Sequence, residues 1–135
     1  MLRRRGFLAI CLFTALRGAP AWSDAARGLR LLMVESKSCL YCAAWRAEIG
    51  PGYGGSAIGR RAPLVPVNID GPYPDGLALA RRPALTPTFI LLRDGIELGR
   101  VEGYAGADQF YPLLAQMMAH AGIPVQQGGK GVADR

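Results

Sequence analysis

The sequence predicts an α/β domain in which a mixed sheet of about four strands is flanked by helices, in the order β-α-β-α-β-β-α. Its 135 residues are enough for one domain with a substantial core. Two apolar runs, 29–35 and 64–69, are separated by a helical pattern, which favours parallel strands joined by a crossover helix. Two later runs, 88–93 and 97–102, are joined through Asp94-Gly95, which is typical of an antiparallel hairpin.

Helices are predicted between these strands. Residues 39–49 follow the first strand as a helix that the turn Ser36-Lys37-Ser38 can cap and that Gly50-Pro51-Gly52 ends. Residues 53–61 are expected to add a second helical piece, and residues 75–82 suit a short helix before the hairpin.

A final amphipathic helix is predicted over residues 108–121, and Gly122 stops it. Its apolar side is formed by Phe110, Leu113, Leu114, Met117 and Met118. The polar segment 126–135 that follows is expected to be a flexible tail.

Residues 1–21 have the organisation of a secretory signal peptide. Arg3-Arg4-Arg5 is a basic start, residues 7–16 form a short apolar run, and Ala19-Pro20-Ala21 is a small-x-small cleavage signal. Cleavage would leave Trp22 as the first residue of the exported chain.

The segment Arg4-Arg5-Gly6-Phe7-Leu8 also resembles the twin-arginine export motif, so the general secretory and twin-arginine routes both stay open. An uncleaved leader that anchors the protein is a third interpretation, although the apolar run is far too short for an ordinary transmembrane helix. Either route predicts a periplasmic protein, with its folded domain at residues 22–125.

Removal of the leader changes the charge of the chain. The full sequence has 16 basic and 10 acidic residues and a net charge of +6. The leader holds four arginines and no acidic residue, which leaves 12 basic residues, 10 acidic residues and a net charge of +2. Most of the excess charge therefore belongs to the leader, and nucleic-acid binding has little support.

The segment Cys39-Leu40-Tyr41-Cys42 is the chemically most informative part of the sequence. The predicted strand before it and the predicted helix after it place Cys39 at a helix start, where the helix dipole stabilises a thiolate. The third cysteine, Cys11, lies in the predicted leader. A disulfide between these cysteines would close too short a loop to stabilise a fold much. A closed zinc site usually needs four ligands, so thiol–disulfide exchange explains the pair best.

The element order, with C-x-x-C at the first strand-to-helix junction, resembles the thioredoxin fold. Thr86-Pro87-Thr88-Phe89 resembles the family's cis-proline segment, and Gly103 matches the glycine that keeps the family's substrate groove open. The resemblance implies that Pro87 faces the cysteines and that Thr86 offers backbone groups to a partner chain.

The predicted chemistry uses a disulfide and no other cofactor. Cys39, as the more exposed cysteine, would attack a partner disulfide, and Cys42 would resolve the mixed disulfide. Tyr41 could donate a hydrogen bond or form part of the contact surface with the partner.

Three segments are similar to the SoxS-type periplasmic thioredoxins that accompany bacterial sulfur oxidation, namely 35–42, 86–89 and 99–104. This similarity implies a reductase that keeps the cysteine of a partner, such as a sulfur-carrier protein, reduced. It also implies a membrane thiol donor of the DsbD/CcdA type, because the sequence shows no flavin or nicotinamide site. We expect a monomer.

The sequence departs from ordinary thioredoxin where the family organises proton transfer. Met33 stands at the place of the family's buried acid. Glu35 points to the same strand face, and either takes over proton transfer to Cys42 or is a surface carboxylate at a strand end. Lys37 either stabilises the thiolate of Cys39 or is a solvated turn lysine.

The direction of the redox reaction stays open at this point, because Leu40-Tyr41 replaces the family's usual Gly-Pro. The alternatives to a reductase are a disulfide-forming oxidase or isomerase, and a binding or regulatory module that uses the same fold without turnover.

Overall fold

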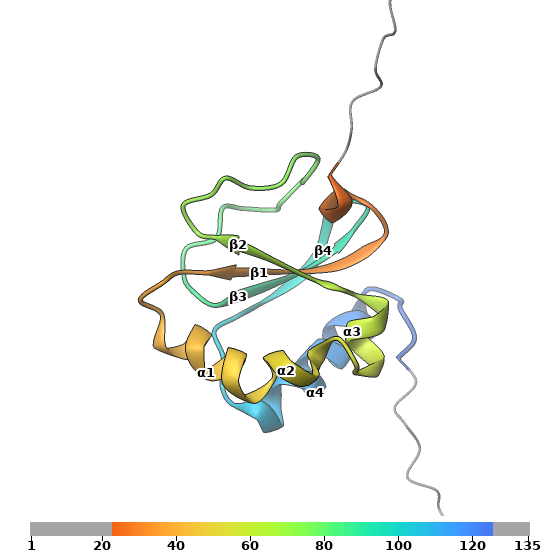
Figure 1. Ribbon diagram of the computed structural model, residues 1–135. Coiled ribbons are helices and arrows are strands. Elements are labelled where there is room, and N and C mark those ends of the chain that lie inside the picture. Colours follow the sequence, from red (N-terminus) through yellow and green to blue (C-terminus); the bar gives the residue numbers. More distant parts are fainter. Residues whose placement is uncertain (1–22, 126–135) are drawn as a thin grey trace, which may run out of the picture.

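The computed structural model describes residues 23–125 (Figure 1). The predicted leader 1–21, Trp22 and the predicted tail 126–135 lie outside the described residues. The strands are β1 (Leu29–Glu35), β2 (Leu64–Asn68), β3 (Thr88–Arg93) and β4 (Ile96–Glu102). The helices are η1 (Asp24–Ala26), α1 (Leu40–Glu48), α2 (Gly50–Tyr53), α3 (Ala57–Arg61) and α4 (Ala107–His120).

The four strands form one mixed sheet in the order β2-β1-β3-β4. β1 pairs parallel with β2 and antiparallel with β3, and β3 pairs antiparallel with β4. The predicted parallel pair and the predicted hairpin are both confirmed. In the hairpin turn, Asp94 and Gly95 both have positive φ angles, 49° and 80°, as a tight two-residue turn requires.

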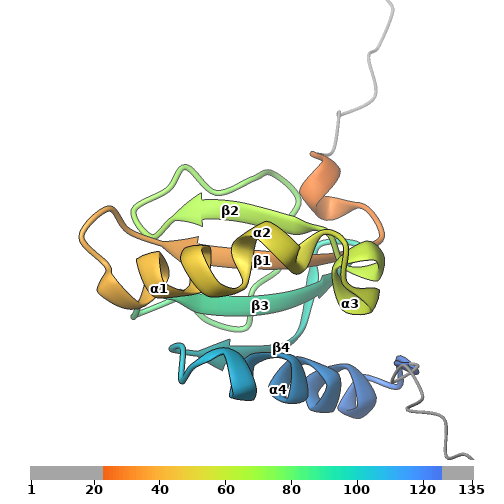
Figure 2. The ribbon, with the colours of Figure 1, turned by 60° about the horizontal axis from the view of Figure 1, so that its bottom comes forward.

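The helices α1 to α4 pack on one face of the sheet (Figure 2). Alternate residues of the central strands point to that face, including Met33 of β1 and Phe89 of β3. Trp45 of α1 packs against Phe89, with ring centroids 5.4 Å apart, and against Phe110 of α4, at 5.6 Å. This aromatic group fixes α1 and α4 against the sheet.

The opposite face of the sheet is covered by the segment 69–87, which contains no helix. The predicted helix at 75–82 is therefore wrong. Gly76 has a φ of +83°, and Leu77 and Leu79 alternate toward the sheet as in an extended chain. The backbone of Ala78 pairs with β4, because its N–H donates to Gly95 and its carbonyl accepts from Glu97.

The helical path after the cysteines also differs from the prediction. Gly50-Pro51-Gly52 does not end the helical path, because α2 begins at Gly50, directly after the single residue that follows α1. Proline is tolerated there because the first turn of a helix needs no N–H donor. The helical piece predicted for 53–61 is present in part, as α3, which Ser56 caps through a hydrogen bond from Gly59 N.

The last helix, α4, lies within one residue of its predicted bounds. Of the five residues on its predicted apolar side, four are buried and Leu113 is half-buried. None of the helices in the described part of the chain is long and apolar enough to cross a membrane.

Candidate active site

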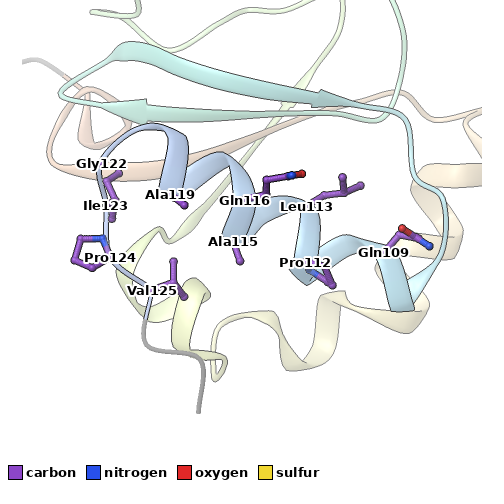
Figure 3. Close-up of a pocket in the computed structure, with 10 residues that line it drawn as sticks. All are labelled: Gln109, Pro112, Leu113, Ala115, Gln116, Ala119, Gly122, Ile123, Pro124 and Val125. Carbon is purple, nitrogen blue, oxygen red and sulfur yellow. The ribbon is translucent and has the colours of Figure 1, made fainter. Parts of the chain in front are cut away.

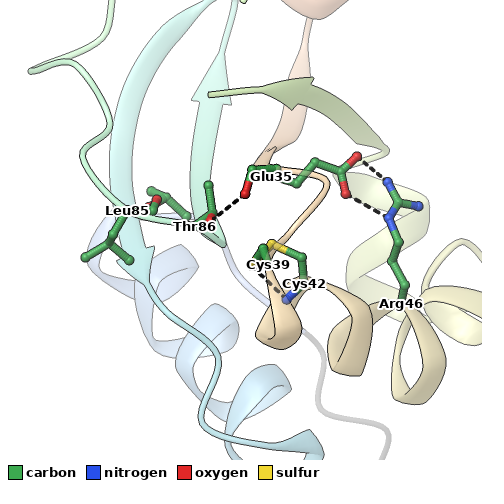
Figure 4. Close-up of a disulfide and its surroundings, with 8 residues drawn as sticks. Glu35, Cys39, Cys42, Arg46, Leu85 and Thr86 are labelled. Carbon is green, nitrogen blue, oxygen red and sulfur yellow. Dashed lines mark hydrogen bonds and ion pairs between the residues drawn. A yellow bond between two sulfur atoms is a disulfide. The ribbon is translucent and has the colours of Figure 1, made fainter. Parts of the chain in front are cut away.

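Cys39 and Cys42 form a disulfide at the N-terminus of α1, with their Cα atoms 5.2 Å apart (Figure 4). Cys42 is buried, with 3% of its surface exposed, whereas Cys39 is partly exposed. The Sγ of Cys39 accepts a hydrogen bond from the backbone N–H of Cys42 at 3.0 Å, so Cys39 itself caps the helix. The accessible sulfur is thus also the one that the helix N-terminus stabilises as a thiolate.

The chain before the disulfide explains this placement. β1 is buried over Leu31 to Val34 and ends at Glu35, and the turn that follows is closed by a hydrogen bond from Cys39 N to Ser36 O at 3.3 Å. The predicted cap from the serine turn is therefore replaced by the cysteine cap. Trp45, one turn beyond Cys42 and completely buried, anchors the helix in the core.

The segment around Thr86 lies opposite the disulfide (Figure 4). The Thr86–Pro87 peptide bond is cis, and the hydroxyl of Thr86 lies 3.3 Å from the hydroxyl of Ser36. The N–H of Gly103 donates to the carbonyl of Pro87 at 2.7 Å, and Gly103 has a φ of +90°. Three of the predicted groove residues therefore lie together, beside the turn that leads to Cys39.

Exposed apolar side chains border the disulfide. Leu40 and Tyr41, between the cysteines, are 84% and 64% exposed, and Leu85 on the facing segment is 42% exposed. Tyr41 lies on the surface, as its predicted contact role requires. Leu85 was missed by the sequence analysis, although its position two residues before Pro87 is a signal that could have found it.

A cavity of about 350 Å³ lies beside the disulfide. The residues around it are Glu35, Ser36, Lys37, Cys39, Cys42, Ala43, Arg46 and Asn68. Glu35 and Lys37 thus both border the same space as the two sulfurs, while Met33 is fully buried in the core and offers no proton acceptor.

Glu35 is held by Arg46, a residue of α1 to which the sequence analysis assigned no role in the site. The Nε of Arg46 donates to Oε2 of Glu35 at 2.8 Å, and its Nη2 donates to Oε1 at 2.5 Å. The hydrogen bond to Glu35 raises the pKa of Arg46. The spacing of four residues between Cys42 and Arg46 places both on one helix face, which is the signal that could have identified this arginine.

A second cavity and the single histidine lie apart from the residues that border the disulfide. A cavity of about 800 Å³ follows α4 and the segment 122–125, but no titratable or nucleophilic side chain lines it (Figure 3). Within residues 23–125, no cluster of three or more histidine, cysteine or acidic side chains could hold a metal ion. The single histidine, His120, is exposed at the end of α4.

A family model described as a thioredoxin-like domain matches residues 23–118. The chain belongs to the thioredoxin-like family. A comparison with curated protein sequences finds no match. Together with the disulfide at the start of α1, membership of this family makes the protein a thiol–disulfide oxidoreductase.

Solved structures extend this thioredoxin-like assignment. The chain is similar to the periplasmic thioredoxin SoxS from Paracoccus pantotrophus in its reduced form, with 49% sequence identity and a TM-score of 0.67. That match covers 69% of this chain and 98% of SoxS.

More distant thioredoxins also match. Fasciola hepatica thioredoxin is 16% identical, with a TM-score of 0.44, and the match covers 68% of this chain and 84% of that one. Malassezia sympodialis thioredoxin is 17% identical, with a TM-score of 0.45, and the match covers 72% of this chain and 80% of that one. Likenesses of this size carry no argument about function.

Proposed function

We propose that this protein is an exported reductase that keeps the thiol of a partner protein reduced through a cycle of the Cys39–Cys42 dithiol and disulfide. The partner would be a protein with a reactive cysteine, such as a sulfur-carrier protein. The observation that carries this proposal is the 49% identity to a periplasmic SoxS thioredoxin over 98% of that protein.

The proposed reaction starts from the reduced protein. The thiolate of Cys39 attacks one sulfur of the partner disulfide, which forms a mixed disulfide and releases the other partner sulfur as a thiolate. Cys42 then loses its proton, attacks the sulfur of Cys39 and releases the second partner thiolate. Two electrons pass to the partner, and the Cys39–Cys42 disulfide is formed.

The residues around the disulfide would also take part in this reaction. The backbone of Thr86 would pair with an extended partner segment, with Pro87 and Gly103 shaping the groove and Tyr41 contacting the partner. Glu35, which borders the cavity next to Cys42, would accept its proton.

Lys37 borders the same cavity, so its charge would favour the thiolate of Cys39. The side chain of Lys37 is exposed, so solvent and salt should screen its charge and the stabilisation of the thiolate should be small.

The cellular setting belongs to the same proposal. Residues 1–21 would direct export to the periplasm by the general secretory or the twin-arginine route, residues 22–125 would form the folded domain, and residues 126–135 a flexible tail. A membrane thiol donor of the DsbD/CcdA type would return the disulfide to the dithiol. The protein would act as a monomer, without bound cofactor or nucleic acid.

The trapping of a partner tests this function. In a Cys42→Ser variant, the mixed disulfide through Cys39 cannot be resolved, so the partner should stay covalently bound and be identifiable by mass spectrometry. The matched control is Cys39→Ser, which keeps only the buried sulfur and should trap little.

Other results would support the alternatives. If no partner is trapped while binding survives the loss of both cysteines, the protein is a binding or regulatory module. If the trapped partners are folding proteins that gain disulfides, the protein is an oxidase or isomerase.

A further inference from the structure

Arg46 has no role in the reaction described above, yet its side chain is fixed beside the sulfurs. It lies one helical turn after Cys42 on α1, and both of its hydrogen bonds go to Glu35 at the end of β1. Figure 4 shows this ion pair on the side of the disulfide away from Leu85 and Thr86. A partner seated on the Thr86 segment would therefore leave the ion pair in place.

The pair belongs to the same cavity as both cysteines, which also contains Lys37. The side chain of Arg46 is 49% exposed and that of Glu35 is 24% exposed. Solvent therefore reduces the field of both charges at the sulfurs without removing it, because the charged side chains and the two cysteines border one cavity.

Reduction of the disulfide creates a negative charge at the sulfurs whenever a thiol ionises. A positive charge nearby stabilises the thiolate and so favours the dithiol, whereas a negative charge favours the disulfide. Arg46 and Glu35 exert these opposite effects from almost the same place. As long as they are paired, their effects on the sulfurs largely cancel.

We propose that Arg46 is a positioning residue that holds Glu35 and balances its charge, so that the Glu35–Arg46 ion pair keeps the reduction potential of the Cys39–Cys42 disulfide near the value it would have without either charge. This inference rests on the thiol–disulfide exchange proposed for the site. If it holds, removal of the charge of Glu35 alone or of Arg46 alone shifts the reduction potential of the disulfide, and the two shifts have opposite signs.

The expected shifts follow from the charge that remains. In Glu35→Gln, the charge of Arg46 is unbalanced, so the dithiol is favoured and the protein becomes more oxidising. In Arg46→Met, the charge of Glu35 is unbalanced, so the disulfide is favoured and the protein becomes more reducing. Each equilibrium constant should change about three- to tenfold, where tenfold corresponds to about 30 mV.

The experiment equilibrates the full chain and its variants with mixtures of reduced and oxidised glutathione at pH 7. Two glutathione thiols supply the two electrons, so one disulfide breaks as another forms, and the dithiol fraction is measured by thiol alkylation and mass spectrometry. An equilibrium constant does not depend on how fast protons move, so a kinetic role of Glu35 does not affect this measurement.

Three variants serve as controls. The double variant Glu35→Gln/Arg46→Met should return to within about a factor of two of the wild-type constant, and Arg46→Lys, which keeps the charge, should stay near wild type. Glu102→Gln breaks the other exposed arginine–glutamate pair, with Arg81, which does not border the disulfide cavity, and should change nothing.

Single variants that shift the potential in the same direction, or not at all, would overturn the inference while leaving the oxidoreductase function intact. A wild-type protein that does not exchange with glutathione would overturn both. The failure of one proposal is thus distinguishable from the failure of the other.

Discussion

At the scale of single residues, the two sulfurs of the active site occupy different environments. Cys39 caps α1 and is partly exposed, so it can reach a partner. Cys42 is buried, and it borders the cavity beside the disulfide that it forms with Cys39. In the proposed reaction, this asymmetry would divide the roles of nucleophile and resolving cysteine between two otherwise identical side chains.

Gly103 offers a test at this scale. Its φ of +90° is a conformation that L-residues other than glycine avoid, although a methyl group at this position would meet no neighbouring atom within 4 Å. Gly103→Ala should therefore lower the free energy of unfolding by roughly 1–2 kcal/mol through backbone strain alone. Chemical denaturation measures this change.

The matched control is Gly54→Ala. Gly54 also has open space around it, but its φ is −61°, which alanine adopts readily. This substitution should stabilise the protein by about 0.4–1 kcal/mol. Equal losses of stability in both variants would contradict the strain argument.

At the scale of elements, the segment 69–87 is where sequence reasoning failed. A short helix was expected at 75–82, whereas this segment is an extended chain that covers the sheet. The backbone of Ala78 in this segment pairs with Gly95 and Glu97, at the start of β4. A local sequence pattern cannot predict a pairing with a later part of the chain. The alternation of Leu77 and Leu79 was the one local signal for an extended chain.

Two charged residues of β4 form hydrogen bonds to the backbone of the segment 69–87. The carboxylate of Glu97 accepts hydrogen bonds from Arg100 Nε at 2.7 Å and from the backbone N–H of Ala80 at 2.7 Å. The side chains of Glu97 and Arg100 are each only 6% exposed. Arg100 also donates to the carbonyl of Arg81 at 2.8 Å, so the pair joins the strand to the chain that leads toward Thr86.

Glu97→Ala should destabilise the protein by about 3 kcal/mol at pH 7, because it removes the nearest carboxylate, at 2.7 Å, from a largely buried arginine. The loss of stability for Glu102→Gln should stay below about 1 kcal/mol, because its ion pair with Arg81 is exposed and its contact with Arg100 is long, at 3.9 Å. Urea denaturation of both variants measures the difference, and equal losses would contradict the assigned burial.

The same carboxylate predicts a pH dependence. The hydrogen bond from Arg100 lowers the pKa of Glu97 in the folded protein. Its contribution to stability is therefore complete above the ordinary glutamate pKa of about 4.3 and is lost as the pH falls through the lower pKa of the folded state. Stability measured from pH 7 to pH 3 should fall less steeply in Glu97→Gln than in the wild type.

At the scale of the whole molecule, the active site is assembled from three parts of the chain that meet at one end of the sheet. The sequence predicted the end of β1, the start of α1 and the segment at Thr86, because each carries a short motif with its own local signal. It did not predict the Glu35–Arg46 pair, because that contact depends on how α1 packs against β1. The predicted parallel strand pair and the predicted hairpin followed from hydrophobic pattern and turn chemistry alone.

The central claim is that Cys39 and Cys42 form a reducing dithiol, and the reduction potential of the wild-type protein tests it most directly. Equilibration with glutathione at pH 7 should give a value near that of thioredoxin, about −270 mV. A value near that of DsbA, about −120 mV, would contradict the reductase and favour a disulfide-forming oxidase.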